Sequence, residues 1–243
     1  MCVASIAWQA HPDWLLVAVG NRDELHERAS APLARWDDAS GISAGRDLQG
    51  GGTWLGASTS GRFALVTNYR VPEGPQPGRP SRGVLVTDIL QGKTPERTAE
   101  MNPFNLVAVD RDRAWIFSNY PEEIAFTLSP GIHGLSNGGF EDPWPKTQQL
   151  NAALGTWLFS EPADVDGLFA ALRAETPTAA SPPDVRDPEP DFAPVFIRNP
   201  LYGTRCSTVV AIDRNGAGTI VERRFSPEGA PTGETAIEFA WPA

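Results

Sequence analysis

The chain has 243 residues, and its 20 Lys and Arg stand against 30 Asp and Glu, which gives a formal net charge of −10. A balance this acidic argues against a nucleic-acid partner and against docking on an anionic membrane, because both kinds of binding depend on clustered cations. Two cysteines cannot supply the disulfide framework of a small secreted domain. We expect a single domain over residues 1–243, long enough to bury a sizeable core.

Targeting signals are weak at the start of the chain. The first twenty residues contain no Lys or Arg and only a short apolar run, so they do not resemble a secretory signal. No stretch approaches the roughly 18 apolar residues of a membrane span. Residue 2 is not Gly, which excludes N-myristoylation. We therefore expect a cytoplasmic protein without a membrane span, and its oligomeric state stays open.

The first part of the chain predicts two β-hairpins. Cys2–Trp8 and Trp14–Gly20 are apolar runs on either side of a polar turn. Thr53–Ser58 and Arg62–Tyr69 flank a Ser-Gly turn and form the second predicted pair. The proline-rich stretch 72–80 that follows is predicted to be a loop.

A short helix and two further strands come next. Ser81 is the predicted N-cap of a helix that runs through Leu90 and is closed by Gly92. Phe104–Asp110 and Ala114–Ser118 then predict two strands joined by an Asp-Arg turn.

The second half of the chain predicts grouped helices and then strands. Lys146–Phe159 places apolar residues on one helical face, and a second helix is expected from near Pro162 to Arg173. Residues 176–194 are too rich in proline for regular structure. The inward face of the first helix is predicted to be Leu150, Leu154, Trp157 and Leu158, and that of the second Val165, Leu168, Phe169 and Leu172. Three strands are predicted to follow, namely Cys206–Asp213, Gly218–Phe225 and Thr235–Trp241. This order favours a layered α+β fold with antiparallel strands.

Metal and cofactor motifs are not predicted. The three histidines, at positions 11, 26 and 133, lack the spacing of metal ligands. The glycines Gly50–Gly52 with Gly56 do not match the dinucleotide pattern GxGxxG, and a hairpin rather than a helix follows them. We interpret them as a turn where two backbone segments approach closely.

Cys2 is the clearest chemical signal in the sequence. The initiator methionine is usually removed when residue 2 is small, and this would make Cys2 the N-terminal residue. An N-terminal cysteine carries a thiol with a pKa of about 8.5 beside an amine with a pKa of about 8, which is a nucleophile with its own base. The alternative is that Cys2 is a small apolar residue of a strand.

A charged group lies at the end of the strand that is expected to pair with the Cys2 strand. Arg22 would lower the pKa of a nearby thiol, and Asp23 would hold or orient the terminal ammonium. The alternative interpretation is an ordinary charged turn at a strand end.

A set of blocks resembles one family. In order, the chain contains MCVASIAW, VAVGNRDE, GGGTWLG, LVTNYR, GLSNG, DPWPK and YGTRCSTV. Together they resemble the NRDE family, also called the transport and Golgi organization family, over nearly the whole chain. That family is in turn similar to the cysteine N-terminal-nucleophile hydrolases, such as the choloylglycine hydrolases. The resemblance implies a four-layer αββα sandwich.

The resemblance also implies roles for individual residues. Cys2 matches the nucleophile, and Arg22 and Asp23 match the charged pair beside it, although the hydrolases read Arg-Asn-x-Asp where this chain reads Asn-Arg-Asp. Asn68 and Asn137 match two asparagines that stabilise an oxyanion, and Arg205 in YGTR matches an arginine of the hydrolase site. By residue type alone, the two asparagines would be interpreted as turn residues.

Strand alternation gives one further prediction. If Arg205 points into the site, Cys206 faces the opposite side of its strand, away from Cys2. We therefore predict no disulfide between Cys2 and Cys206.

The leading functional hypothesis is an amidohydrolase that cleaves a linear amide C–N bond, such as that of an N-acyl compound, through a thioester on Cys2. The proline-rich loops 72–80 and 176–194 are candidate lids. The alternative is a non-catalytic lipid- or haem-binding or trafficking protein on the same scaffold. The expected partner is a small-molecule amide or a lipid-like ligand, with no cofactor.

Overall fold

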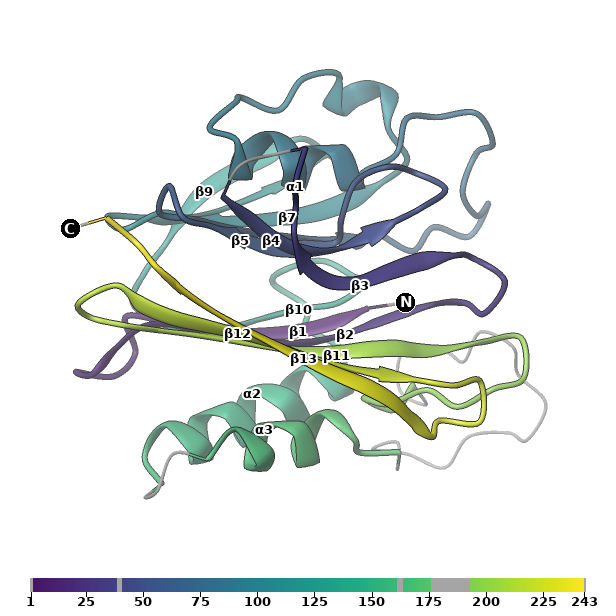
Figure 1. Ribbon diagram of the computed structural model, residues 1–243. Helices are drawn as coiled ribbons and strands as arrows, with labels where there is room; N and C mark the ends of the chain where they lie inside the picture. The colour runs from purple at the N-terminus through teal and green to yellow at the C-terminus, as the bar shows by residue number, and fades with distance from the viewer. Residues whose placement is uncertain (1, 39–40, 161–163, 176–192, 243) are drawn as a thin grey trace.

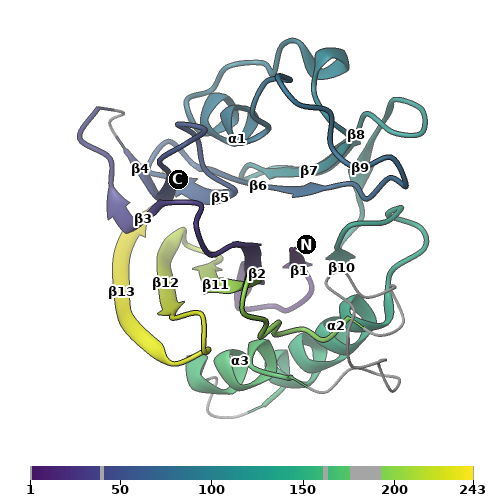
Figure 2. The same ribbon diagram turned by 90° about the vertical axis from the view of Figure 1, so that its right-hand side faces the viewer.

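The computed structural model describes residues 2–38, 41–160, 164–175 and 193–242. Two antiparallel sheets lie face to face, with helices on both outer faces, as Figures 1 and 2 show. The first sheet contains six strands in the order β10 (Gly131–Leu135), β1 (Val3–Trp8), β2 (Trp14–Leu25), β11 (Tyr202–Asp213), β12 (Ala217–Phe225) and β13 (Pro231–Ala240). The second contains seven strands in the order β3 (Ser30–Arg35), β4 (Ile42–Asp47), β5 (Leu55–Ser58), β6 (Arg62–Asn68), β7 (Phe104–Val109), β8 (Ala114–Ser118) and β9 (Ile124–Leu128).

Three layers of buried apolar side chains hold the four structural layers together. The helices α2 (Pro145–Leu158) and α3 (Val165–Leu172) pack on the outer face of the six-stranded sheet. The helix α1 (Gly83–Leu90) covers part of the seven-stranded sheet, and the short 3-10 helix η1 (Thr98–Glu100) follows it. The largest cluster lies between the two sheets. The fold is therefore the predicted αββα sandwich. None of the described helices combines the length and the apolar character that are needed to cross a bilayer.

The predicted hairpins and helix faces are confirmed, with corrections at their ends. Helix α1 begins at Gly83, and its N-cap position is Arg82 with no capping side chain, so the prediction of Ser81 as N-cap was wrong. Strand β13 begins at Pro231 and not at Thr235. The α3 cap is Asp164, whose side chain accepts a hydrogen bond from the Asp166 N–H at 3.0 Å. Pro162 and most of the predicted loop 176–194 lie outside the described residues.

Four strands were not predicted from the sequence, namely β3, β4, β9 and β10. They are short, and two of them, β4 and β10, contain glycine, which weakens the alternating pattern by which a strand is predicted. Strand β9 has the apolar sequence IAFTL but is exposed at four of its five positions, so its residues contribute little to the core. Two of these strands matter for the site, because β4 ends next to β2 and the segment after β10 supports the start of β1.

The glycine turn makes the close backbone approach that the sequence predicts. A Cβ atom added at Gly52 would collide with the backbone of Gly83 at the start of α1. The Thr53 N–H also donates to the Gly83 carbonyl at 3.3 Å. The turn therefore places the start of α1, and with it Arg82, beside the end of β4.

Candidate active site

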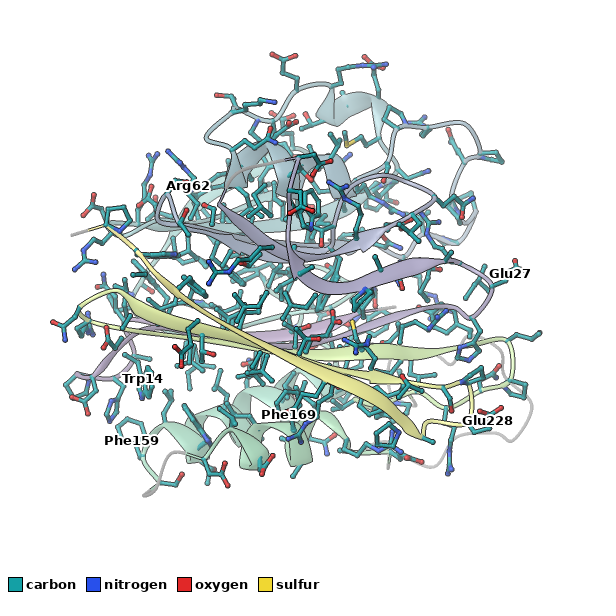
Figure 3. The ribbon with its side chains drawn as sticks, viewed as in Figure 1. Trp14, Glu27, Arg62, Phe159, Phe169 and Glu228 are labelled. Atoms are coloured by element: carbon teal, nitrogen blue, oxygen red, sulfur yellow. The ribbon has the colours of Figure 1, made fainter. Side chains whose placement is uncertain are left out.

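One end of the space between the two sheets is hollow. Figure 3 labels Trp14, the first residue of β2, and Glu27, just beyond its last residue, at opposite ends of the molecule. The hollow end is the one near Glu27, because the last residues of β2 line the cavity. The cavity there has a volume of about 740 Å³ and contains Cys2 in its wall. We call it the Cys2 cavity.

Strand alternation explains why this cavity is polar while the rest of the inter-sheet layer is apolar. On β2, Leu16 and Ala18 belong to the apolar cluster between the sheets, and Arg22 continues the same face two pleats further on. On β11, Val210 belongs to that cluster and Cys206 continues its face. The same pleat that builds the core therefore aims polar side chains into the cavity at its end.

The prediction that Cys206 faces away from Cys2 was wrong. Cys206 and Arg205 both line the Cys2 cavity. The register of β11 against β2 shifts between Thr204 and Cys206, so Arg205 is the extra residue of a β-bulge. A bulge interrupts the alternation on which the prediction depended.

The predicted absence of a disulfide is confirmed, because both cysteines are free thiols. Val3 pairs with Asn21 and Cys206 pairs with Arg22, so β2 lies between the strands that carry the two cysteines. Two strand spacings are roughly 9–10 Å, which exceeds the Cα separation of a disulfide.

Cys2 is a buried thiol at the wall of the cavity, 8% exposed. Burial raises the pKa of the Cys2 thiol, and the charge of Asp23 raises it further. The backbone N–H of Asp23, which hydrogen-bonds to the sulfur, and the charge of Arg22 lower that pKa and so favour the thiolate. The carbonyl of Cys2 accepts a hydrogen bond from the Ser136 hydroxyl at 3.1 Å. This bond anchors the start of β1.

Asp23 is a buried carboxylate behind the thiol. Burial raises the pKa of Asp23 to about 6, although the charge of Lys146, a hydrogen bond from Thr204 and the charge of Arg22 favour its ionised form. The Thr204 hydroxyl donates to Asp23 Oδ1 at 2.6 Å. Lys146, near the start of α2, is completely buried. Asp23 therefore changes its protonation state close to neutral pH.

Arg22 is held in the cavity wall by acidic side chains. Its Nη2 atom lies 3.3 Å from Asp47 Oδ2 and 3.7 Å from Glu24 Oε2. Asp47 also binds Arg28 Nε at 2.7 Å, and its other oxygen accepts the backbone N–H of Gly50 at 2.8 Å. Asp47 was not among the predicted site residues, although the glycine turn that follows it was the available signal.

The structure separates the two predicted oxyanion asparagines. Asn68, at the end of β6, lines the Cys2 cavity. Asn137 is buried and donates from Nδ2 to the backbone carbonyl of Asn68 at 2.7 Å. It lines an adjoining cavity of about 410 Å³ and not the Cys2 cavity. We call this second space the apolar cavity, since side chains such as Val71 and Leu201 line it.

Five of the six predicted site residues therefore lie on one cavity, namely Cys2, Arg22, Asp23, Asn68 and Arg205. The loop predicted over residues 72–80 contributes Pro75 and Arg79 to the same wall. The other candidate lid falls mainly on residues outside the described part of the chain. In that described part, no three His, Cys, Asp or Glu side chains are grouped as a metal site.

Two solved structures with a similar fold are a hydrolase and an amidase by name. The conjugated bile acid hydrolase of Clostridium perfringens, in its mutant C2A, matches with a TM-score of 0.57 and 8% identity over 98% of this chain and 92% of that one. The Caenorhabditis elegans ortholog of N-acylethanolamine-hydrolyzing acid amidase matches with a TM-score of 0.50 and 11% identity over 86% and 92%. The fold is that of the N-terminal-nucleophile hydrolases.

The chain belongs to the Transport and Golgi organisation 2 family, whose family model matches residues 1–227. It is 31% identical to the Homo sapiens Transport and Golgi organization protein 2 homolog, and the match covers 97% of each chain. The Bos taurus homolog is 32% identical over 92% of each chain, and the Mus musculus homolog is 30% identical over 97%.

Proposed function

We propose that this protein is an N-terminal-cysteine amidohydrolase that cleaves the C–N bond of a small linear amide. The observation that supports it best is the place of Cys2, in the wall of the polar cavity between the two sheets and beside Arg22 and Asp23. The names of the two similar structures describe an amidase for N-acylethanolamine and a hydrolase for conjugated bile acids. Both names support an acyl compound as the substrate.

The proposed reaction has two steps and requires that Met1 is removed. In the first step the amine of Cys2 takes the thiol proton, and the sulfur attacks the carbonyl carbon of the amide. The C–N bond then breaks, the terminal ammonium gives its proton to the leaving amine, and a thioester remains. In the second step water attacks the thioester, the C–S bond breaks, and the acid is released while the thiol regains a proton.

Asn68 and the arginines have stabilising roles in this proposal. The Asn68 amide would donate to the oxyanion, and such a donor typically contributes about 3 kcal/mol to lowering the barrier. Asn137 would fix Asn68, because it already holds the Asn68 carbonyl at 2.7 Å. Arg22 would favour the Cys2 thiolate, and Arg205 would supply a fixed positive charge. Asp23 would orient the terminal ammonium.

A binding protein without turnover is the second candidate. The apolar cavity beside the Cys2 cavity favours it, since a lipid-like ligand would fill such a space without any chemistry. Both candidates use the same cavities, and they differ in whether Cys2 forms a covalent bond.

Intact-mass measurements separate the two candidates. We expect purified protein to lack Met1, and brief incubation with an N-acyl amide followed by acid quenching to add the mass of the acyl group at Cys2. Cys2→Ala should abolish both the added mass and the release of amine, whereas Cys206→Ala, which changes the other cysteine of the cavity, should retain them. Retention of Met1, or turnover by Cys2→Ala, would show that the mechanism is wrong.

A further inference from the structure

The Cys2 cavity carries an excess of positive charge on a chain whose net charge is −10. Among the described residues, seven arginines and four carboxylates line it. The arginines are Arg22, Arg28, Arg46, Arg79, Arg82, Arg205 and Arg224, and the carboxylates are Asp23, Glu24, Asp47 and Glu222. The acidic residues of this protein are therefore mostly elsewhere, and the cavity attracts anions.

Three of these arginines are bound to neutral groups. Arg79 donates to the side-chain oxygen of Gln76 at 2.7 Å and to the carbonyls of Glu100 and Met101 at 3.3 and 3.2 Å. Arg82 donates to the Pro103 carbonyl at 3.0 Å.

Arg205 donates to the carbonyls of Leu25 and His26 at 3.0 and 2.6 Å. In the described part of the chain, no carboxylate lies within 4.0 Å of the guanidinium of Arg79, Arg82 or Arg205. The charge of Glu24 reaches Arg82, but Glu24 also lies 3.7 Å from both Arg22 and Arg28.

Arg22 lines the same cavity and has a buried donor that is not satisfied. Its side chain is nine-tenths buried, and its Nη1 atom has no hydrogen-bond partner among the described residues. A buried guanidinium nitrogen without an acceptor costs free energy unless a ligand supplies one. The unsatisfied donor of Arg22 is a second observation, separate from the excess of arginines over carboxylates. It also favours an anion with several acceptor atoms.

The apolar cavity adjoins this charged one. Six residues line both spaces, namely Glu24, Leu25, Asn68, Pro75, Arg82 and Asn102. Side chains such as Val71, Pro103 and Leu201 line only the apolar cavity. A ligand that crosses the shared wall would place an apolar chain on one side and a charged group on the other.

We propose that the ligand of this site is an anionic amphiphilic amide, with an apolar acyl chain in the apolar cavity and a carboxylate or similar anion among Arg22, Arg79, Arg82 and Arg205. This inference rests on the proposed function, since it specifies the substrate class for the same site. An uncharged amide of equal length would offer the arginines only a neutral acceptor, which forms a weaker hydrogen bond than a carboxylate does.

The test is equilibrium binding to Cys2→Ala protein, which cannot form the thioester, so that affinity is measured apart from turnover. The two probes are N-dodecanoylglycine and N-dodecanoylethanolamine, which share the amide and the chain and differ in a terminal carboxylate or hydroxyl. We expect the glycine conjugate to bind at least tenfold more tightly by titration calorimetry, and the advantage to shrink as salt is raised.

Substitutions of single arginines test which of them binds the carboxylate of the ligand. Arg79→Gln should weaken binding of the glycine conjugate about three- to tenfold and leave the ethanolamine conjugate unchanged, and Arg79→Lys should restore most of the affinity. Arg46→Gln is the matched control, because Arg46 lines the same cavity but its Nη2 lies 2.8 Å from both oxygens of Asp38. It should change affinity less than twofold.

The outcomes separate this inference from the proposed function. Equal affinity for the two conjugates, or no binding of the glycine conjugate, would overturn the anionic ligand class even if other amides are hydrolysed. Selective binding of the glycine conjugate without turnover by the wild-type protein would support the ligand class and reject the hydrolase.

Discussion

The carboxylate of Asp47 links the two sheets at the site. It belongs to β4 of one sheet, and it lies 3.3 Å from Arg22 on β2 of the other. Burial alone would raise its pKa, but the Gly50 N–H and the guanidinium of Arg28 hold the pKa of Asp47 below its ordinary value. Asp47 therefore stays ionised and keeps Arg22 beside the Cys2 thiol.

Asp47→Asn should slow the reaction of Cys2 with iodoacetamide at pH 8 about threefold or more. Without the ion pair, Arg22 is less fixed, and the pKa of the Cys2 thiol rises. The rate is measured by mass spectrometry on the peptide that contains Cys2. Asp110→Asn is the control, since Asp110 also accepts backbone N–H groups in a turn and pairs with Arg113 at 3.2 Å, far from the thiol. Equal rates for both variants would reject the role of Asp47.

Asp23 should make the stability of the protein depend on pH. Its pKa is about 6 in the folded protein and near 3.8 in the unfolded chain, so the folded state holds this proton more tightly. The resulting contribution is fully present below pH 3.8 and is lost as pH rises through 6. The rise of the Asp23 pKa from 3.8 to about 6 corresponds to about 3 kcal/mol in the free energy of unfolding.

Asp23→Asn removes this titration. Between pH 4 and 7, the free energy of unfolding of the wild type should fall by up to about 3 kcal/mol relative to the variant, as measured by urea denaturation at each pH. Thr204→Val leaves the carboxyl in place and should keep a pH dependence of the same sign. Parallel pH profiles for the wild type and Asp23→Asn would contradict the raised pKa.

At the scale of elements, the glycine turn after β4 and the bulge in β11 determine which side chains reach the cavity. The turn brings the start of α1 against the end of β4, through Gly52 and Gly83. The bulge places Arg205 and Cys206 on the same cavity. Both elements therefore set the positions of arginines that line the cavity.

Gly52→Ala should destabilise the protein by about 1–3 kcal/mol, because the new Cβ collides with the backbone of Gly83 and one segment must move. The midpoint of urea denaturation measures the change. Gly139→Ala is the control, since the nearest atom to its added Cβ is the Tyr69 hydroxyl at 3.7 Å. If both variants lose equal stability, the close approach at Gly52 is not the cause.

In the whole molecule, the space between the sheets has an apolar end and a polar end. The apolar cluster fills the one, and the Cys2 cavity occupies the other. The long strands β2 and β11, twelve residues each, run through both ends, as Figure 1 shows. One pair of strands therefore supplies both the largest core and the candidate site.

The features that depend on local pattern can be predicted from the sequence. Alternating and helical periodicity predicted the hairpins, the buried faces of α2 and α3, and the layered arrangement. The position of Cys2 and the blocks around Arg22, Asn68 and Arg205 predicted most of the residues that now line one cavity. These predictions agree with the structure because each depends on neighbouring residues within a single element.

Contacts between residues far apart in the sequence depend on the packing of the two sheets. Asp47 reaches Arg22 across the gap between two sheets, and Arg79 and Arg82 enter the cavity from a loop and a helix start. Cys206 lies on the cavity face of β11 by regular alternation, and the bulge at Arg205 brings Arg205 onto the same cavity. Periodicity within a strand cannot report such a bulge, since sheet packing and not local sequence sets it.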